Sequence, residues 1–297
     1  GEIGLDGEMH GISGILPIVL CARSLGSRFC VVPYENLKEG RLIRDVPVAG
    51  VKNLRELVEC LKNPEPYLKR EIQEEIPSII NTDMGMDFSD IEGQEGAKRA
   101  AEIAVSGFHN LLLIGPPGTG KTMLARRLPT IMPGLGFEEK LELTRIYSIA
   151  GLLSREHPLI DERPFRSPHH TSTPQAIAGG GRNPRPGEIT LAHKGVLFLD
   201  EMPEFSRASL ELLRQPMEDK VIQIARASGT YNFPADFMLC AAMNPCPCGY
   251  YPDLNRCTCT AGEITHYMGK ISRPLLDRID ISTEVPPISF SQLHCGR

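Results

Sequence analysis

One glycine-rich segment constrains the fold of this chain more than any other feature. Residues 115–122 read GPPGTGKT, directly after the apolar run 110–114 and before a helix-forming run at 123–128. Gly118 and Gly120 let backbone N–H groups close around phosphate oxygens, and the start of the helix adds partial positive charge. The motif and its strand–loop–helix context predict a phosphate-binding loop in an α/β domain. The alternative is an ordinary glycine-rich turn before a helix.

The side chains of this loop indicate a nucleotide bound together with magnesium. Lys121 supplies a positive charge for the β- and γ-phosphates of ATP, and the Thr122 hydroxyl is a ligand for Mg²⁺. We therefore expect ATP and Mg²⁺ as the bound groups. The expected nucleotide contacts are Gly115, Pro116, Pro117, Gly118, Thr119, Gly120, Lys121, Thr122 and Met123.

Two further apolar runs end in polar residues that suit the same chemistry. Residues 195–199 lead to Asp200 and Glu201, and residues 237–243 lead to Asn244. In α/β sheets, ligands lie at the carboxyl ends of the strands. We predict that Asp200 holds Mg²⁺, that Glu201 polarises the attacking water as general base, and that Asn244 senses the γ-phosphate. Ordinary strand ends are the alternative.

Composition limits the class of protein. The chain has 297 residues, 41% of them apolar and 23% charged, which fits a globular protein and excludes a disordered one. Its net charge of −5 excludes a uniformly basic nucleic-acid coat. No apolar run approaches the ~18 residues of a membrane helix, and no secretory signal is visible. Because there is no initiator Met, we expect the chain to begin inside a longer protein.

The nine cysteines divide into five scattered residues and one cluster of four. An odd number of mostly isolated cysteines indicates a reducing, cytoplasmic location rather than a secreted disulfide framework. The clustered thiols suit a tetrahedral Zn²⁺ ion, with free buried thiols or reversible disulfides as alternatives. They form two C-x-C pairs with eight residues between them, and are Cys246, Cys248, Cys257 and Cys259.

Prolines, charges and apolar periodicity divide the chain into three segments. Residues 1–63 hold short strand-like runs and a helical repeat after Asn53, which predict part of a small α+β module. Residues 64–86 are rich in proline and acidic residues and are expected to form a linker. In residues 87–297, helical patterns alternate with short apolar runs, which predicts a parallel sheet with helices on both faces.

The segment 163–194, here called the basic insertion, has a charge opposite to that of the whole chain. A run of glycines at 179–181 favours a hairpin tip within it. We predict that its basic groups contact a nucleic-acid backbone; the alternative is a solvated loop whose arginines pair with ATP or neighbouring subunits. His169 and His170 are not expected to share one metal ion, because adjacent side chains on a helix or strand point apart. Its charged residues sum to +4 and are Arg163, Arg166, Arg182, Arg185, Glu188 and Lys194.

Several motifs together resemble the AAA+ ATPases, most closely their magnesium-chelatase-like branch and its YifB/ComM group. The resemblance implies a three-layer αβα P-loop core with a parallel sheet, followed by a C-terminal helical lid that is missing here. It implies that Ile91 and Gln94 lie at the adenine pocket and that Asn244 is sensor 1. Arg278 matches the arginine finger better than Arg273 does. The motifs occupy residues 87–94, 110–122, 164–171, 195–205, 244–249 and 272–280.

The same resemblance implies an assembly and a function. Each ATP site needs an arginine from a neighbour, so we expect a ring-forming homo-oligomer, a hexamer by analogy. ComM-like proteins imply a DNA translocase or helicase for branch migration in natural transformation or recombination. The alternative is a magnesium-chelatase-like motor subunit that remodels a protein partner. Residues 1–63 resemble the end of a Lon-protease-like domain with Leu16 at the lysine position, so we expect no peptidase activity.

Overall fold

The computed structural model describes residues 1–71, 87–154, 158–181, 184–226 and 229–287. It divides into two compact units, Gly1–Thr82 with Leu135–Asp161 and Asp83–Gly134 with Glu162–Arg297. The segment 135–161 therefore groups with the N-terminal residues, whereas the sequence pattern assigns it to the segment 87–297. The acidic stretch 72–86, Arg182 and Cys295 lie outside the described residues.

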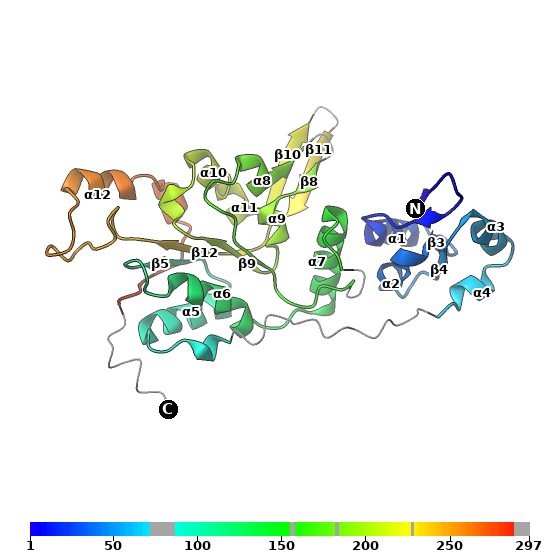
Figure 1. The fold of residues 1–297 in the computed structure, drawn as a ribbon, viewed down its shortest axis with the longest axis horizontal. Coiled ribbons are helices and arrows are strands. Elements are labelled where there is room, and N and C mark those ends of the chain that lie inside the picture. Colours follow the sequence, from blue (N-terminus) through cyan, green and yellow to red (C-terminus); the bar gives the residue numbers. More distant parts are fainter. Residues whose placement is uncertain (72–86, 155–157, 182–183, 227–228, 288–297) are drawn as a thin grey trace. The chain divides into compact units, whose positions relative to one another are not determined.

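A five-stranded sheet forms the middle of the second unit (Figure 1). Its strands are β5 (Leu111–Ile114), β6 (Phe165–Arg166), β9 (Val196–Leu199), β12 (Met238–Met243) and β13 (Ile281–Glu284). They follow the order β13-β5-β12-β9-β6, and every neighbouring pair is parallel. The three apolar runs singled out in the sequence form β5, β9 and β12, so the predicted parallel sheet is confirmed.

Helices cover both faces of this sheet (Figure 1). Side chains alternate along each strand, so Leu111 and Leu113 pack into the core on one face and Leu112 into the core on the other. The expected three-layer αβα core is confirmed. One face carries α5 (Glu95–Gly107) and α6 (Lys121–Ile131); the other carries α8 (Pro174–Ala178), α9 (Glu188–Leu191), α10 (Arg207–Glu211) and α11 (Arg214–Asp219).

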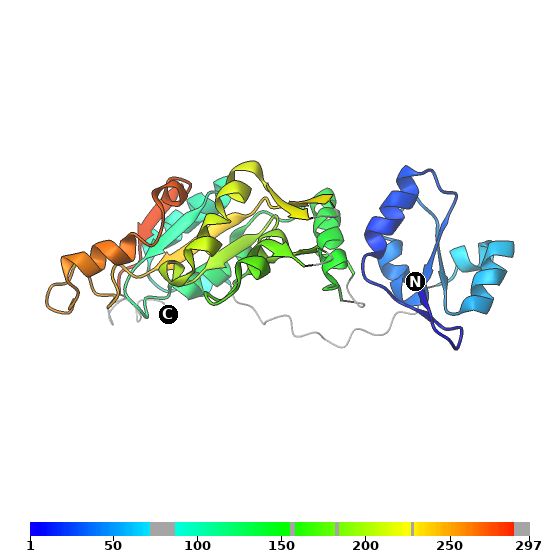
Figure 2. The same ribbon diagram turned by 90° about the horizontal axis from the view of Figure 1, so that it is seen from above.

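Two antiparallel hairpins of this unit touch each other. β7 (Gly179–Gly180) pairs with β8 (Arg185–Pro186), so two of the glycines expected at a hairpin tip lie in a strand of the hairpin instead. β10 (Val221–Arg226) pairs with β11 (Gly229–Pro234), a hairpin that the sequence did not predict. A Cβ atom built on Gly179 would lie 3.3 Å from Ile224 Cδ1. Figures 1 and 2 place the β10–β11 hairpin and α12 (Ala261–Met268) at opposite ends of the unit. The shorter elements are η2 (Phe88–Asp90), η3 (Met202–Glu204) and α13 (Arg273–Leu276).

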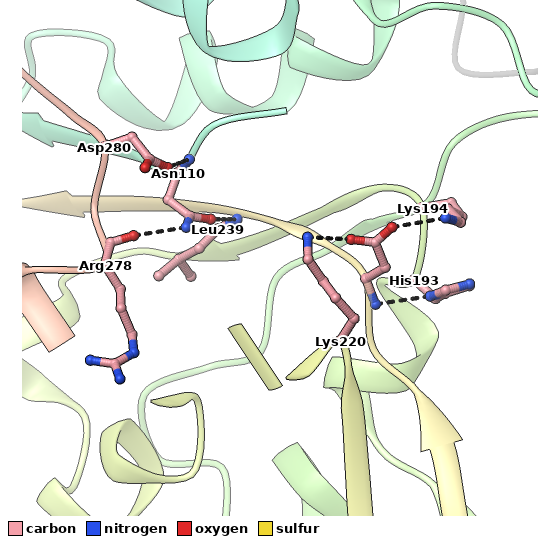
Figure 3. A network of polar contacts seen from close by, with 8 residues as sticks. Asn110, His193, Lys194, Lys220, Leu239, Arg278 and Asp280 are labelled. Carbon is pink, nitrogen blue, oxygen red and sulfur yellow. Dashed lines mark hydrogen bonds and ion pairs between the residues drawn. The ribbon is translucent and has the colours of Figure 1, made fainter. Parts of the chain in front are cut away.

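Most described cations of the basic insertion are bound by groups within the chain. Arg166 donates two hydrogen bonds of 2.7 and 2.8 Å to the carboxylate of Glu188 on α9. Arg163 donates to two backbone carbonyl oxygens. Lys194 lies 2.8 Å from the Asp236 carboxylate, which also pairs with a lysine from the end of α11 (Figure 3). Arg185 on β8 is exposed.

Asn110, which precedes β5, connects three segments of the second unit (Figure 3). Its amide nitrogen donates to the Arg278 carbonyl at 2.8 Å, and its amide oxygen accepts from the backbone N–H of Leu239 on β12 at 2.9 Å. Its own backbone N–H donates to the Asp280 carboxylate at 2.7 Å. These bonds hold the segment that carries Arg278 against the central strands.

The first unit is a small α+β body with its own core. β3 (Cys30–Pro33) pairs in parallel with β4 (Val48–Val51), and α1 (Ile15–Ser24) packs against both this sheet and α7 (Phe137–Ala150). The buried carboxylate of Glu39 accepts hydrogen bonds from the Leu16 N–H at 3.0 Å and the Ser148 hydroxyl at 2.5 Å. Leu16 itself is fully buried in the apolar core. The other elements are β1 (Glu2–Ile3), β2 (Met9–His10), η1 (Tyr34–Asn36), α2 (Leu37–Gly40), α3 (Leu54–Lys62) and α4 (Glu65–Leu68).

In the part of the chain that the structure describes, no helix is both long and apolar enough to cross a membrane.

Candidate nucleotide site

The glycine-rich loop and the ends of β9 and β12 enclose one space of about 440 Å³, here called the loop cavity. Gly118 and Gly120 have φ angles of 77° and 86°, in the left-handed region that glycine favours, directly before α6. The structure thus brings together residues that the sequence analysis took from three separate motifs. The cavity is lined by Pro117, Gly118, Thr119, Gly120, Lys121, Thr122, Met123, Asp200, Glu201, Met243 and Asn244.

A buried ammonium group ties this loop together. The Lys121 residue is only 8% exposed. Its Nζ donates to the carbonyl oxygens of Gly115 and Pro116, at 2.7 and 2.8 Å, and lies 3.2 Å from Asn244 Oδ1. Burial lowers the pKa of Lys121, and the carboxylates at the end of β9 act in the opposite direction. An anion in the loop cavity would favour the charged ammonium further.

Thr122 and Asp200 form a pair of oxygen groups at the cavity wall. The Thr122 hydroxyl donates to Asp200 Oδ2 at 2.7 Å, and Asp200 Oδ1 accepts from the backbone N–H of Glu201 at 3.0 Å. A hydroxyl and a carboxylate side by side are the ligands that Mg²⁺ takes beside nucleotide phosphates. The residues present therefore fit a magnesium ion.

Glu201 occupies a strained backbone position beside His170, a residue for which no role at the nucleotide site was expected. Its φ is 50°, a left-handed conformation that costs a non-glycine residue about 1–2 kcal/mol. Its side chain is 58% exposed, with Oε2 at 3.8 Å from His170 Nδ1. His170 follows β6, which pairs with β9, and its ring meets Phe205 edge-on. The pairing of β6 with β9 places His170 near Glu201, so predicting this strand pair would have identified the residue.

Gln94 reaches the phosphate loop from the start of α5, and Ile91 does not. Gln94 Nε2 donates to the Thr119 carbonyl at 3.3 Å and the Pro286 carbonyl at 2.6 Å. Within the described residues, its buried Oε1 has no hydrogen-bond partner. Ile91 is 2% exposed and packs in the core with α5 and α6. Gln94 lines a second cavity of about 380 Å³, together with Gly93, Glu95, Gly96, Ala97, Glu284, Pro286 and Pro287.

Arg278 lies away from the loop cavity of its own chain. Its guanidinium points away from Asn110 (Figure 3) and bonds to the Glu218 carboxylate on α11 and the Pro274 carbonyl. Its Nε is buried and has no hydrogen-bond partner in the described part of the chain. The structure therefore does not bring Arg278 together with the other predicted catalytic residues.

The four clustered cysteines converge after Asn244. Backbone N–H groups point at these sulfurs: that of Tyr251 donates to Cys246 Sγ at 3.3 Å, and that of Tyr250 lowers the pKa of the Cys248 thiol to about 6. Thiolates that accept such bonds are typical of metal sites, so the group fits a tetrahedral thiolate-bound ion. Their Sγ atoms lie within 4.8 Å of one another and belong to Cys246, Cys248, Cys257 and Cys259.

The family model described as "Magnesium chelatase, subunit ChlI" matches residues 87–293. This chain belongs to that family. As a member of the magnesium chelatase ChlI family, it is an AAA+ protein whose parallel sheet and glycine-rich loop form a nucleotide-binding core.

Similarity over 96% of this chain connects it to a narrower group of proteins. The chain is 45% identical over 287 residues to an uncharacterized protein of Mycobacterium tuberculosis, covering 96% of this chain and 56% of that protein. It is 42% identical over 286 residues to competence protein ComM of Haemophilus influenzae, with the same coverage. It is 41% identical over 287 residues to YifB of Escherichia coli, covering 96% and 55%. The chain thus spans about half the length of the curated relatives it matches.

Replacing His170 by alanine tests the contact with Glu201. We expect ATP hydrolysis to slow by roughly tenfold to a hundredfold with little change in ATP affinity, because a mispositioned group affects the reacting geometry more than binding. His266→Ala is the control, since His266 is an exposed histidine on α12, whereas the ring of His169 packs against that of His170 at 4.1 Å. Steady-state turnover at the wild-type rate in His170→Ala would contradict this role.

Proposed function

We propose that this chain is the ATP-hydrolysing core of a ring-forming motor. The observation that carries the proposal is the convergence of one buried cation, one hydroxyl–carboxylate pair and one exposed carboxylate on the loop cavity. This is the set of groups that phosphoryl transfer to water requires: charge stabilisation, a magnesium site and a base. Family membership supports the same chemistry.

In this proposal, the γ-phosphate of ATP lies in the loop cavity, where Lys121 and backbone N–H groups offset its charge. Thr122 and Asp200 hold Mg²⁺, which when bound neutralises charge on the β- and γ-phosphate oxygens. Glu201 accepts a proton from water as the water oxygen bonds to phosphorus and the bond to ADP breaks. Asn244, next to Lys121, contacts the γ-phosphate.

Gln94 and Ile91 have different roles at the adenine ring of ATP. Gln94 Oε1, buried and without a partner among the described residues, accepts a hydrogen bond from the adenine amino group. Ile91 supports the floor of that region from the core rather than contacting the base directly, because its side chain is almost completely buried.

Glu201→Gln separates binding from chemistry. The amide keeps the shape of the side chain and cannot accept the proton, so we expect hydrolysis to fall by roughly a hundredfold or more while ATP still binds. Phosphate release measures hydrolysis, and equilibrium titration with a fluorescent ATP analogue measures binding. Glu204→Gln is the control, an exposed carboxylate that pairs with Lys270 at 3.1 Å. Retained hydrolysis in Glu201→Gln would show that Glu201 is not the general base.

We infer that the working form is a homo-oligomeric ring, a hexamer by analogy with the family. Arg278 does not line its own loop cavity, and one of its buried N–H groups has no partner among the described residues. In a ring, Arg278 would exchange the Glu218 carboxylate for the phosphates of a neighbour's ATP, where its charge stabilises the transition state.

We further propose that the motor moves DNA, as a ComM-like translocase or helicase in branch migration. The similarity to competence protein ComM of Haemophilus influenzae supports this. On the chain itself, support comes from the exposed Arg185 on the β7–β8 hairpin and the adjoining β10–β11 hairpin, where Tyr231 is 36% exposed. A cation and an aromatic ring on neighbouring hairpins suit a single-stranded backbone and its bases.

DNA-stimulated hydrolysis tests this part of the proposal. We expect single-stranded or forked DNA to raise the ATPase rate, and Arg185→Ala to weaken DNA binding and reduce its salt dependence by about one phosphate contact. Arg99→Ala on α5, an exposed arginine paired with Glu102, is the control. A rate that is indifferent to DNA would favour the alternative, a magnesium-chelatase-like subunit that remodels a protein partner.

We also propose that the four clustered cysteines bind one Zn²⁺ ion, supported by their convergence and their N–H···S bonds. Atomic absorption on protein purified without chelators should give about one zinc per chain, because four thiolates satisfy its tetrahedral preference. Cys257→Ser should lose the metal, whereas Cys240→Ser, at a cysteine buried on β12 away from the cluster, should keep it. A folded chain without metal would contradict this assignment.

A further inference from the structure

The segment that carries the four cysteines touches the phosphate loop directly. Gly249 is buried at a φ of 86°, and a Cβ atom built on it would lie only 2.6 Å from Cδ of Pro117 and 3.3 Å from its Cγ. Pro117 lines the loop cavity. Only a residue without a side chain permits this approach, so the backbone at Gly249 packs against the phosphate loop.

Both ends of this segment are also fixed beside the loop cavity. At one end, Asn244 lies two residues before Cys246 and accepts a hydrogen bond from Lys121. At the other end, α12 begins just after Cys259, and its buried Tyr267 packs in the same apolar core as Met243, the residue before Asn244. The segment 246–259 therefore starts and finishes at elements that share one core beside Asn244.

Short-range hydrogen bonds turn the chain between these ends, such as Gly249 N–H to the Cys246 carbonyl at 3.0 Å and Cys257 N–H to the Asp253 carbonyl at 2.7 Å, and the sulfurs bring its two C-x-C pairs together. Residues 244–260, all of them described, form turns and bends but no helix or strand. Thiols are weak hydrogen-bond partners, so contacts of 3.3 to 3.8 Å between sulfurs hold the segment poorly without an ion. A bound ion would close it into one body, because a metal site of this kind supplies folding free energy.

We propose that a metal ion in the four-cysteine site holds Gly249 against Pro117 and so couples metal binding to nucleotide binding. The ion is of the class that prefers four thiolates, such as Zn²⁺. This inference rests on the nucleotide and zinc sites of the proposed function. Coupling between two sites is reciprocal, so nucleotide tightens metal binding by the same factor as metal tightens nucleotide binding.

The experiment measures both sides of this linkage on the 297-residue chain. The dissociation constant for Zn²⁺ is obtained by competition with a chromophoric chelator, with and without saturating Mg-ADP. The dissociation constant for a fluorescent ADP analogue is obtained for metal-loaded and metal-stripped protein. Each should change by about fivefold or more, and by equal factors. Affinities for zinc that are equal with and without ADP would overturn the coupling.

Glycine variants locate the contact that carries the coupling. Gly249→Ala places a methyl group against Pro117, so we expect it to keep its zinc and lose most of the linkage. Gly262→Ala on α12 and Gly229→Ala at a φ of 139° are the controls, because an added Cβ at either meets nothing within 4 Å. An unchanged linkage in Gly249→Ala would overturn the assigned contact.

The possible failures are distinguishable from one another. A chain that binds ADP and no zinc overturns the zinc site and the coupling while leaving the nucleotide site intact. A chain that binds zinc and no ADP overturns the nucleotide site and the coupling. A chain that binds both with independent affinities overturns the coupling alone.

Discussion

The buried ammonium of Lys121 is the interaction on which the rest of the candidate site depends. An ion in such a position costs several kcal/mol unless polar groups surround it. Here two loop carbonyls and Asn244 supply those groups, so one cation fixes the curve of the loop and its distance from β12. The same desolvation that lowers its pKa prepares it to attract phosphate. The parallel sheet makes this arrangement possible by bringing β5, β9 and β12 to one edge.

Much of this arrangement could be predicted because its signals are local. The glycine-rich loop is a contiguous motif, and each apolar run that precedes a polar residue became a strand of the sheet. The register of β12 between β5 and β9 then places Asn244 beside Lys121 without further information. The convergence of the four clustered cysteines could be predicted for the same reason, because their short spacing in the sequence keeps their sulfurs close in space.

Contacts between residues that are far apart in the chain could not be predicted from the sequence. The basic insertion has a net charge of +4 by count, and the count does not show that Arg166 pairs with Glu188 or that Lys194 pairs with Asp236. From the sequence, His170 is considered only as a metal ligand, because its proximity to Glu201 depends on β6 joining the sheet beside β9. The resemblance assigns Ile91 and Gln94 to one segment, and only the packing shows that Ile91 enters the core while Gln94 bonds to the loop. The β10–β11 hairpin likewise had no motif to reveal it.

The central claim is that the loop cavity binds nucleotide through Lys121, and calorimetric titration of Mg-ADP tests it most directly. Lys121→Met keeps the length and volume of the side chain and removes only the charge and its hydrogen bonds. The account predicts one binding site per chain in the original protein and a loss of at least about tenfold in affinity in the variant, since hydrogen bonds to charged groups contribute about 1.5–3 kcal/mol. Equal affinity in the two proteins would contradict it.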